Sequence, residues 1–162
     1  MLTIRRQALL IGLVILLDQV TKSWAVSALA DGRVIHVIGS LQFSLGFNSG
    51  FAFSQGQGMG PLVGIFAIIA VLFLLRAVRK ATTQLSAMAL CAIVAGALGN
   101  IADRIFRGEG WLHGRVVDFI DVQWWPVFNV ADSSITVGAC ALIAAMLMEA
   151  RSGKGVDNTH ES

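Results

Sequence analysis

Charge is scarce in this chain. Only 14% of its 162 residues are Asp, Glu, Lys or Arg, whereas 56% are hydrophobic and the mean hydropathy is +0.73. A soluble domain of this length has a large surface relative to its volume and needs more polar residues than this. The net charge is only +2 and the basic residues form no continuous stripe, so nucleic-acid binding is not indicated. Charged residues cluster instead at the ends of apolar segments, which is typical of a membrane protein.

Cysteine is also rare. The chain has two, Cys91 and Cys140, and each lies in the middle of an apolar segment. We interpret both as small buried apolar side chains rather than as a disulfide or part of a metal site. The sequence contains no His-x-x-x-His pair, which argues against a zinc hydrolase. Ser133 and Ser134 have only distant histidines as candidate bases, so a nucleophilic triad is not indicated.

Four apolar segments have the length that a helix needs to cross a membrane. The first follows a short basic start, and its alternative interpretation is a cleavable signal peptide ending at Ala28-Leu29-Ala30. Asp18 and Lys22 interrupt the apolar core before that site, which favours a retained membrane helix. We therefore expect transmembrane helices at about residues 7–29, 60–78, 83–102 and 127–149.

The remaining segments are expected to lie outside the membrane. We expect two outer loops, at residues 31–59 and 105–126, and a disordered tail at 152–162. The whole chain, 1–162, is expected to form a single integral-membrane domain. Residues 34–38 and 41–45 show the partial alternation that is typical of strands. In the third helix, the pairs Ala92–Gly96 and Ala95–Gly99 place small residues four apart, which allows close helix packing.

An even number of helices places both termini on the same side of the membrane. Seven Lys and Arg residues lie on that side and five on the other, and four of those five lie among carboxylates. This bias predicts cytoplasmic termini. Separate polar groups then converge at the outer face: Asp18, Asn48, Asn100, Asp103, Asp118 and Asp132.

Two of these aspartates carry the strongest signal of function. Asp118 lies in an apolar run and Asp132 opens the last apolar segment, while Trp124 and Trp125 between them mark the membrane surface. A carboxylate inside a membrane segment costs about 2.5–3.5 kcal/mol. Two carboxylates that come together can share one proton, so that one acts as acid and the other as base. The sequence leaves open which of the two holds the proton.

Other polar residues have spacings that predict support for this pair. Asp18 and Lys22 are four residues apart with the acid first, which favours a helical ion pair. Asn100 and Arg104 share a helix face next to Asp103, and we expect Arg104 to hold nearby carboxylates ionised and in position. We interpret both acid–base pairs as supporting structure rather than as chemistry.

Two alternatives compete with an acid–base hydrolase. The carboxylates at 103, 118, 121 and 132 are a candidate ligand set for a hard cation such as Mg²⁺ or Ca²⁺. An ion or proton carrier would need polar groups through the whole bilayer and an internal repeat, and the sequence has neither. If the segment around Asp118 is locally helical, Asp121 lies one turn away from it.

Five short motifs occur together and in order: Asp18-Gln-Val-Thr-Lys22, Asn48-Ser-Gly-Phe-Ala-Phe53, Gly99-Asn-Ile-Ala-Asp-Arg104, Val116-Val-Asp-Phe119 and Phe128-Asn-Val-Ala-Asp132. With this set the chain resembles bacterial lipoprotein signal peptidase, also called signal peptidase II. The resemblance implies an all-α membrane protein of four transmembrane helices with a small extracytoplasmic β-cradle, which fits residues 34–54. It also implies that the loop at 106–115 is a variable lid.

The resemblance implies an aspartic endopeptidase of the bacterial inner membrane with its active site near the periplasmic face. It would remove signal peptides from prolipoproteins by cleaving on the N-terminal side of a diacylglyceryl-modified cysteine. Asp118 and Asp132 would be the catalytic pair. The substrate-binding or dyad-supporting positions would be Asp18, Lys22, Asn48, Asn100, Asp103, Arg104 and Asn129.

No cofactor or metal is expected from this resemblance. The expected partners are prolipoproteins and membrane lipids, without nucleic acid, and the expected state is a monomer. The aromatic run from Phe43 to Phe53 is expected to offer a surface for the substrate's acyl chains.

Overall fold

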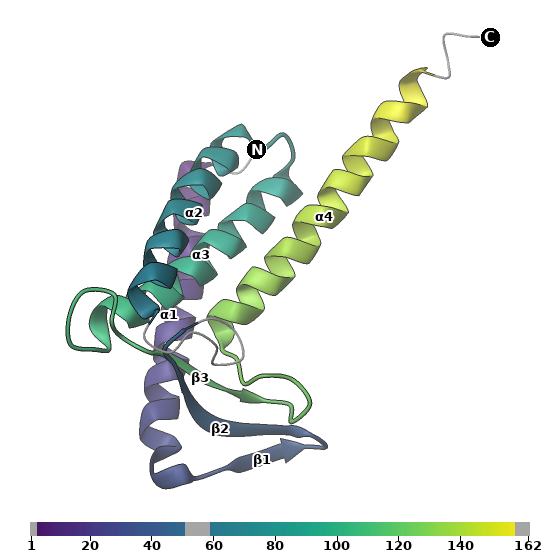
Figure 1. The fold of residues 1–162 in the computed structure, drawn as a ribbon. Coiled ribbons are helices and arrows are strands. Elements are labelled where there is room, and N and C mark those ends of the chain that lie inside the picture. The colour runs from purple at the N-terminus through teal and green to yellow at the C-terminus, as the bar shows by residue number, and fades with distance from the viewer. Residues whose placement is uncertain (1–2, 51–58, 158–162) are drawn as a thin grey trace.

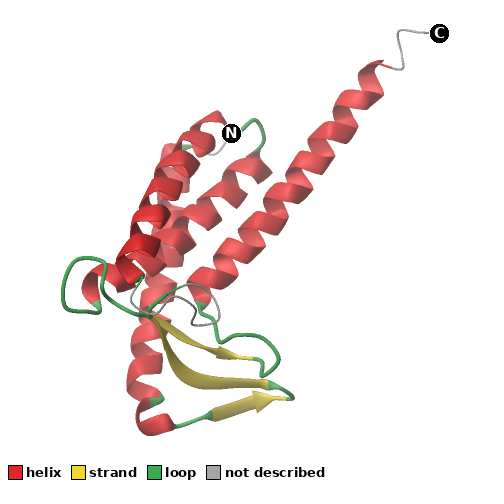
Figure 2. Cartoon of the chain, in the orientation of Figure 1, coloured by secondary structure: helices red, strands yellow, loops and turns green. Residues whose placement is uncertain are grey.

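Four long helices and one small sheet make up the computed structural model, which describes residues 3–50 and 59–157 (Figures 1 and 2). Each helix is long and apolar enough to cross a membrane. The helices are α1 (Ile4–Ala28), α2 (Gly60–Lys80), α3 (Gln84–Phe106) and α4 (Val130–Asp157), and the strands are β1 (Ile35–Ile38), β2 (Leu41–Asn48) and β3 (Val116–Asp121). A short 3₁₀ helix, Ala30–Gly32, follows α1. The expected fold class, a helical membrane protein with a small sheet, is confirmed.

The central helix of the bundle is α3, against which α1, α2 and α4 all pack. The most apolar window of α3 is 56% buried, compared with 17% for each of the other three helices. Small residues make this packing possible, as the sequence predicted. A side chain at Gly96 would collide with the Ala131 carbonyl of α4, and one at Gly99 would lie 2.7 Å from the Asp18 carboxylate of α1.

Two helices end at least four residues later than the sequence predicted. The third continues to Phe106 instead of ending at 102, because Asp103 and Arg104 have partners inside the fold and need not leave the helix. The fourth continues to Asp157, past its predicted end at 149 and into the predicted tail. The charged residues Glu149 and Arg151 are as compatible with a helix that leaves the membrane as with a tail, so the sequence does not locate this end.

The three strands form an antiparallel sheet in the order β1-β2-β3. Phe43 pairs with Ile120 and Gly46 pairs with Asp118 across β2 and β3. The first two strands were predicted, but β3 lies in a segment that was predicted to be a loop. Its first four residues are all buried, so it lacks the alternation that identifies a half-exposed strand.

Because β3 is a strand, the idea that Asp121 lies one helical turn from Asp118 is wrong. Residues three apart in a strand point to opposite faces of the sheet. The predicted cradle is seen as these three strands, and its expected residues 51–54 lie outside the described part of the chain.

An aromatic cluster attaches the sheet to the end of α1. Trp24 meets Phe43 and Phe119 edge-on, with ring centroids 5.4 and 6.1 Å away, beside the buried Ala25 and Leu29. The sheet therefore lies at the end of the bundle opposite both termini (Figure 1). This attachment fixes β3, and with it Asp118, relative to the helices.

Candidate active site

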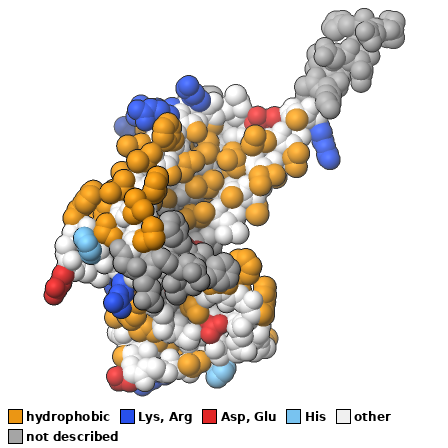
Figure 3. Space-filling model, viewed as in Figure 1, with side chains coloured by type: hydrophobic (Ala, Val, Ile, Leu, Met, Phe, Trp, Pro, Cys, Tyr) orange, Lys and Arg blue, Asp and Glu red, His pale blue; other side chains and the backbone are white. Residues whose placement is uncertain are grey.

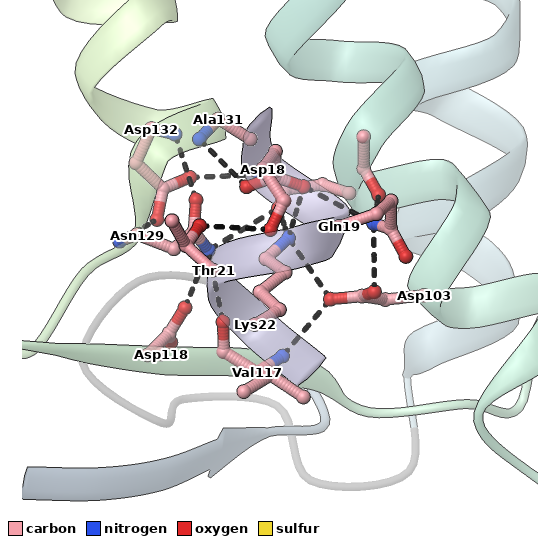
Figure 4. A network of polar contacts seen from close by, with 12 residues as sticks. Asp18, Gln19, Thr21, Lys22, Asp103, Val117, Asp118, Asn129, Ala131 and Asp132 are labelled. Carbon is pink, nitrogen blue, oxygen red and sulfur yellow. Dashed lines mark hydrogen bonds and ion pairs between the residues drawn. The ribbon is translucent and has the colours of Figure 1, made fainter. Parts of the chain in front are cut away.

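The structure brings Asp118 and Asp132 together through Asn129, from which hydrogen bonds reach both carboxylates (Figure 4). Asp118 comes from the middle of β3 and Asp132 from the first turn of α4. The Asn129 side-chain amide donates to Asp118 Oδ1 at 2.7 Å. The Asn129 backbone N–H donates to Asp132 Oδ2 at 3.3 Å, and the Asp132 N–H donates to Asn129 Oδ1 at 2.9 Å. This reciprocal pair is a capping box, so the element that starts α4 also positions both aspartates.

Asp132 receives a further hydrogen bond from α3. The Asn100 side-chain NH₂ donates to Asp132 Oδ1 at 2.8 Å. The Asn100 oxygen faces the other way and accepts from Lys22 Nζ at 2.9 Å. Because an ammonium can only donate, Lys22 fixes the orientation of this amide and directs its NH₂ toward Asp132.

Lys22 is completely buried and pairs with two buried carboxylates. Its ammonium lies 2.9 Å from Asp18 Oδ2 and 2.9 Å from Asp103 Oδ2, which confirms the predicted Asp18–Lys22 ion pair. Asp103 also pairs with Arg107 at 2.9 Å. Asp103 accepts the N–H of Val117 in β3 at 3.0 Å as well, so the network joins α1, α3 and the strand that carries Asp118.

Asp18 links the same network to α4. Its Oδ1 accepts the Ala131 N–H at 2.9 Å, and that N–H belongs to the first turn of α4. A carboxylate at this position complements the partial positive charge of a helix N-terminus. Gln19, which the sequence analysis left without a role although it lies in the first motif, donates to both Asp18 and Asp103 at 3.1 Å.

Arg104 was expected to hold carboxylates in position, but it forms no ion pair with a carboxylate of the described residues. Its Nη2 donates to the Gly50 carbonyl at 2.9 Å, whereas its buried Nη1 has no hydrogen-bond partner among the described residues. Among the described residues, Asn48 likewise makes no hydrogen bond to either aspartate. Its Oδ1 accepts the Gly50 N–H at 3.0 Å in a local turn.

A cavity of about 330 Å³ contains both aspartates, and Asn48, Asn100 and Arg104 line it as well. Two larger openings adjoin it. One, of about 510 Å³, contains Asp118 and lies along β2 at Gly46, Phe47 and Asn48. The other, of about 530 Å³, contains Asp132 and lies along the first turns of α4; its lining residues are Val122, Trp124, Trp125, Phe128, Asp132, Ser133, Thr136 and Val137.

The two aspartates of β3 have different electrostatic surroundings. Burial, and next the nearby Asp132 carboxylate, raise the pKa of Asp118 to about 7. Hydrogen bonds from Gln42, at 2.7 Å, and from Ser44 lower the pKa of Asp121, which faces away from the cavity. Asp121 therefore does not lie with the other carboxylates that the sequence offered as ligands for a hard cation. Across residues 3–50 and 59–157, no three His, Cys, Asp or Glu side chains are grouped as a metal ion would need.

Similarity to known proteins covers most of the chain. The family described as Signal peptidase (SPase) II matches residues 10–148. The chain is 41% identical over 138 residues to the lipoprotein signal peptidase of Rhodococcus jostii, which covers 85% of this chain and 70% of that protein. It is 41% identical over 147 residues to the lipoprotein signal peptidase of Mycobacterium leprae, covering 88% and 73%.

The fold is similar to that of a solved structure described as a bacterial membrane enzyme. The two superpose with a TM-score of 0.81 at 32% identity, over 91% of this chain and 90% of that one. A second structure with the same description, determined at 1.9 Å resolution, gives a TM-score of 0.76 at 32% identity.

The network makes a prediction for stability. Lys22→Met leaves Asp18 and Asp103 buried without their shared ammonium, and removing one partner of a buried ion pair costs about 3–5 kcal/mol. We expect a loss of this size in the free energy of unfolding, measured by denaturant titration in detergent. The matched control is Arg107→Met, because the partly exposed Arg107 also pairs with Asp103 and should contribute at most about 1 kcal/mol. Equal losses in the two variants would contradict the central place given to Lys22.

Proposed function

The chain belongs to the signal peptidase II family, and from that membership we propose that it is an aspartic endopeptidase that cuts prolipoproteins before a diacylglyceryl-modified cysteine. Family membership makes it a multi-pass membrane protease that removes signal peptides from prolipoproteins. The aspartic mechanism is our own proposal. One observation carries it: Asp118 and Asp132 line one cavity and are joined by hydrogen bonds from Asn129.

The two aspartates have unequal sets of donors, which suggests their roles. Asp132 accepts from the Asn100 amide and from the Asn129 backbone, whereas within residues 3–50 and 59–157 Asp118 accepts only from the Asn129 amide. Donors stabilise an ionised carboxylate, so Asp132 is the base. Asp118, with its pKa raised to about 7 by burial and then by the Asp132 charge, keeps a proton and is the acid.

The reaction then proceeds without a cofactor. Asp132 takes a proton from water, whose oxygen attacks the scissile carbonyl carbon, while Asp118 gives its proton to the carbonyl oxygen. In the second step a hydroxyl group of the tetrahedral intermediate returns a proton to Asp118. Asp132 gives its proton to the amide nitrogen as the C–N bond breaks, and the pair regains its starting protonation.

The remaining predicted positions divide into two groups. Five support the dyad through the buried network: Asp18, Lys22, Asn100, Asp103 and Asn129. Asn48 and Arg104 line the cavity without bonding to either aspartate, so in this proposal they contact the substrate.

The first prediction concerns the dyad. Asp118→Asn and Asp132→Asn should each lower the rate of signal-peptide release by at least about a thousandfold, roughly 4 kcal/mol, because an amide cannot cycle a proton. The assay follows a lipidated prolipoprotein with the purified protein in detergent. Asp121→Asn is the matched control in the same strand, since Asp121 lies outside the cavity, and should stay near the wild-type rate. Near-normal turnover in either dyad variant would remove the assignment.

The raised pKa of Asp118 predicts the alkaline limb of the pH profile. A carboxyl whose pKa is raised to about 7 keeps its proton below that pH and loses it above. Because Asp118 must donate that proton, kcat/KM should fall as the pH rises through about 7, and this ratio reports ionisations of the free enzyme. Rates measured from pH 5 to 9 check this. A profile that stays flat to pH 9 would show that Asp118 is not the acid.

We also propose that both termini are cytoplasmic and that the dyad lies near the periplasmic face. The end of the bundle that holds both termini carries basic residues at the start of α1 and the end of α2 (Figures 1 and 3): Arg5, Arg6, Arg79 and Lys80. With the exposed Cys140 replaced by alanine, we expect Ser40→Cys to react with an impermeant thiol reagent in intact spheroplasts. Thr3→Cys should react only after the membrane is opened. The opposite pattern would reverse the orientation.

The substrate's lipid needs a different surface from the one that the sequence suggested. Phe43 packs against Trp24 and Phe119, and Phe47 lines the opening on the Asp118 side, while residues 51–53 lie outside the described part of the chain. The groove along α4 is better suited, because it begins at Asp132 and has walls formed by Trp124, Phe128 and Val137.

The polar side chains of that groove are already satisfied. The Thr136 hydroxyl donates to the Asp132 carbonyl, and the Ser133 hydroxyl donates to the Asn129 carbonyl, both at 2.9 Å. The groove therefore presents mainly apolar surface next to the dyad, at a depth that the exposed Trp124 places near the membrane surface. In our proposal it holds the acyl chains, which gain about 0.8 kcal/mol per buried CH₂.

The test is the preference for lipidated over unlipidated forms of one substrate in the same detergent. Val137→Ser, in the groove, should reduce this preference because it makes the acyl surface polar. Phe47→Ser, in the opposite opening, is the control and should leave the preference unchanged. If Val137→Ser slows both substrates equally, the groove holds peptide rather than lipid.

A further inference from the structure

One buried side chain holds the loop between α3 and β3 (residues 107–115). Leu112 is completely buried although both its neighbours, Trp111 and His113, are exposed. Its φ is +61°, in the left-handed region that leucine rarely adopts. Such a conformation persists only when the surrounding structure requires it. Leu112 thus anchors this loop.

The anchor is a contact with the first turns of α2. A Cβ added at Gly64 would lie 2.9 Å from Leu112 Cδ2 and 3.0 Å from Cδ1, so the absence of a side chain there creates the space that Leu112 fills. One turn earlier, the position of a Cβ on Gly60 is 3.3 Å from the Leu112 carbonyl oxygen. Both glycines therefore accept this one residue of the loop.

The end of the loop is fixed on α3. The Gly114 N–H donates to the Arg104 carbonyl at 2.9 Å, and a side chain at Gly114 would collide with the Asp103 carbonyl. The chain then enters β3 two residues before Asp118. Leu112 consequently connects the start of α2 to the end of α3 and to the strand that carries one of the two aspartates.

The start of α2 forms one wall of the dyad cavity. Val63, which precedes Gly64, lines the cavity together with Arg104. The position of a Cβ on Gly60 is 3.6 Å from Arg104 Nη1, the guanidinium nitrogen that has no partner among the described residues. Any movement of this turn would change the wall of the cavity and the space beside the Arg104 guanidinium.

We propose that Leu112 is a positioning residue whose side chain, seated against Gly64, holds Val63 and Arg104 in place at the cavity of Asp118 and Asp132. Its effect on catalysis rests on the proposed function, but its effect on α2 does not. Neither Leu112 nor Gly64 belongs to the five sequence motifs. The role follows from a contact between two residues, 112 and 64, that are 48 positions apart in the sequence.

The first test needs no substrate. Leu112→Gly removes the side chain and leaves a residue that adopts a positive φ without strain. Amide hydrogen exchange should become faster across residues 60–64, of which Pro61 has no amide hydrogen and Val63 has its N–H bonded to the Met59 carbonyl. Exchange should stay unchanged at residues 70–76 of the same helix. Trp111→Ala, at the exposed neighbour, should change neither region. Unchanged exchange at 60–64 in Leu112→Gly would overturn the proposal.

The second test measures cleavage with the same variants. Misplacing a wall of the site should raise KM and lower kcat/KM, by up to about 10²-fold for a displacement near 1 Å. Gly64→Ala changes the other side of the contact and should give the same defect. Leu112→Met keeps a side chain of similar volume and should retain a kcat/KM near that of the wild-type protein. Leu112→Gly with wild-type kcat/KM would overturn the role in catalysis. If the wild-type protein itself cleaves nothing, the proposed function fails, while hydrogen exchange still decides whether Leu112 holds α2.

Discussion

The buried ammonium of Lys22 is the interaction on which the site depends. It lies 2.9 Å from Asp18, Asp103 and Asn100, in a part of the protein where an uncompensated charge would be costly. Each of these three partners then positions another element: Asp18 binds the first turn of α4, Asp103 binds β3, and Asn100 binds Asp132. A single cation from α1 thus fixes how the helices and the sheet meet around the two aspartates.

That arrangement makes the two aspartates chemically different although they share one cavity. Asp132 accepts from α3 and from the start of its own helix, whereas Asp118 is more deeply buried and has one amide donor in the described part of the chain. The same asymmetry extends to the surroundings, because the opening at Asp118 runs along the sheet and the groove at Asp132 runs along a membrane helix. The proposed substrate, with a peptide and a lipid branch, would meet a site that differs on its two sides.

The sequence predicts those features that local spacing determines. The four helices follow from apolar length, the Asp18–Lys22 pair from a four-residue interval, and the close packing at Gly96 from small residues. It failed where burial removes the pattern, as in β3, and where a partner lies far along the chain, as in the Arg104 bond to the Gly50 carbonyl. The position of Leu112 was not predicted because its contact, Gly64, also lies far along the chain.

The proposed shared action of Asp118 and Asp132 on one carbonyl is tested most directly by a pair of inhibitors. One is a substrate peptide whose scissile amide is replaced by a hydroxyl-bearing tetrahedral carbon, and the other is its matched analogue without the hydroxyl. Transition-state analogues bind at least about 10²-fold more tightly than substrates, and the hydroxyl should supply a gain of that size only when both aspartates can bind it. We predict this gain in the wild-type protein and its loss in Asp118→Asn and in Asp132→Asn. Equal affinity of the wild-type protein for the two peptides would contradict the account.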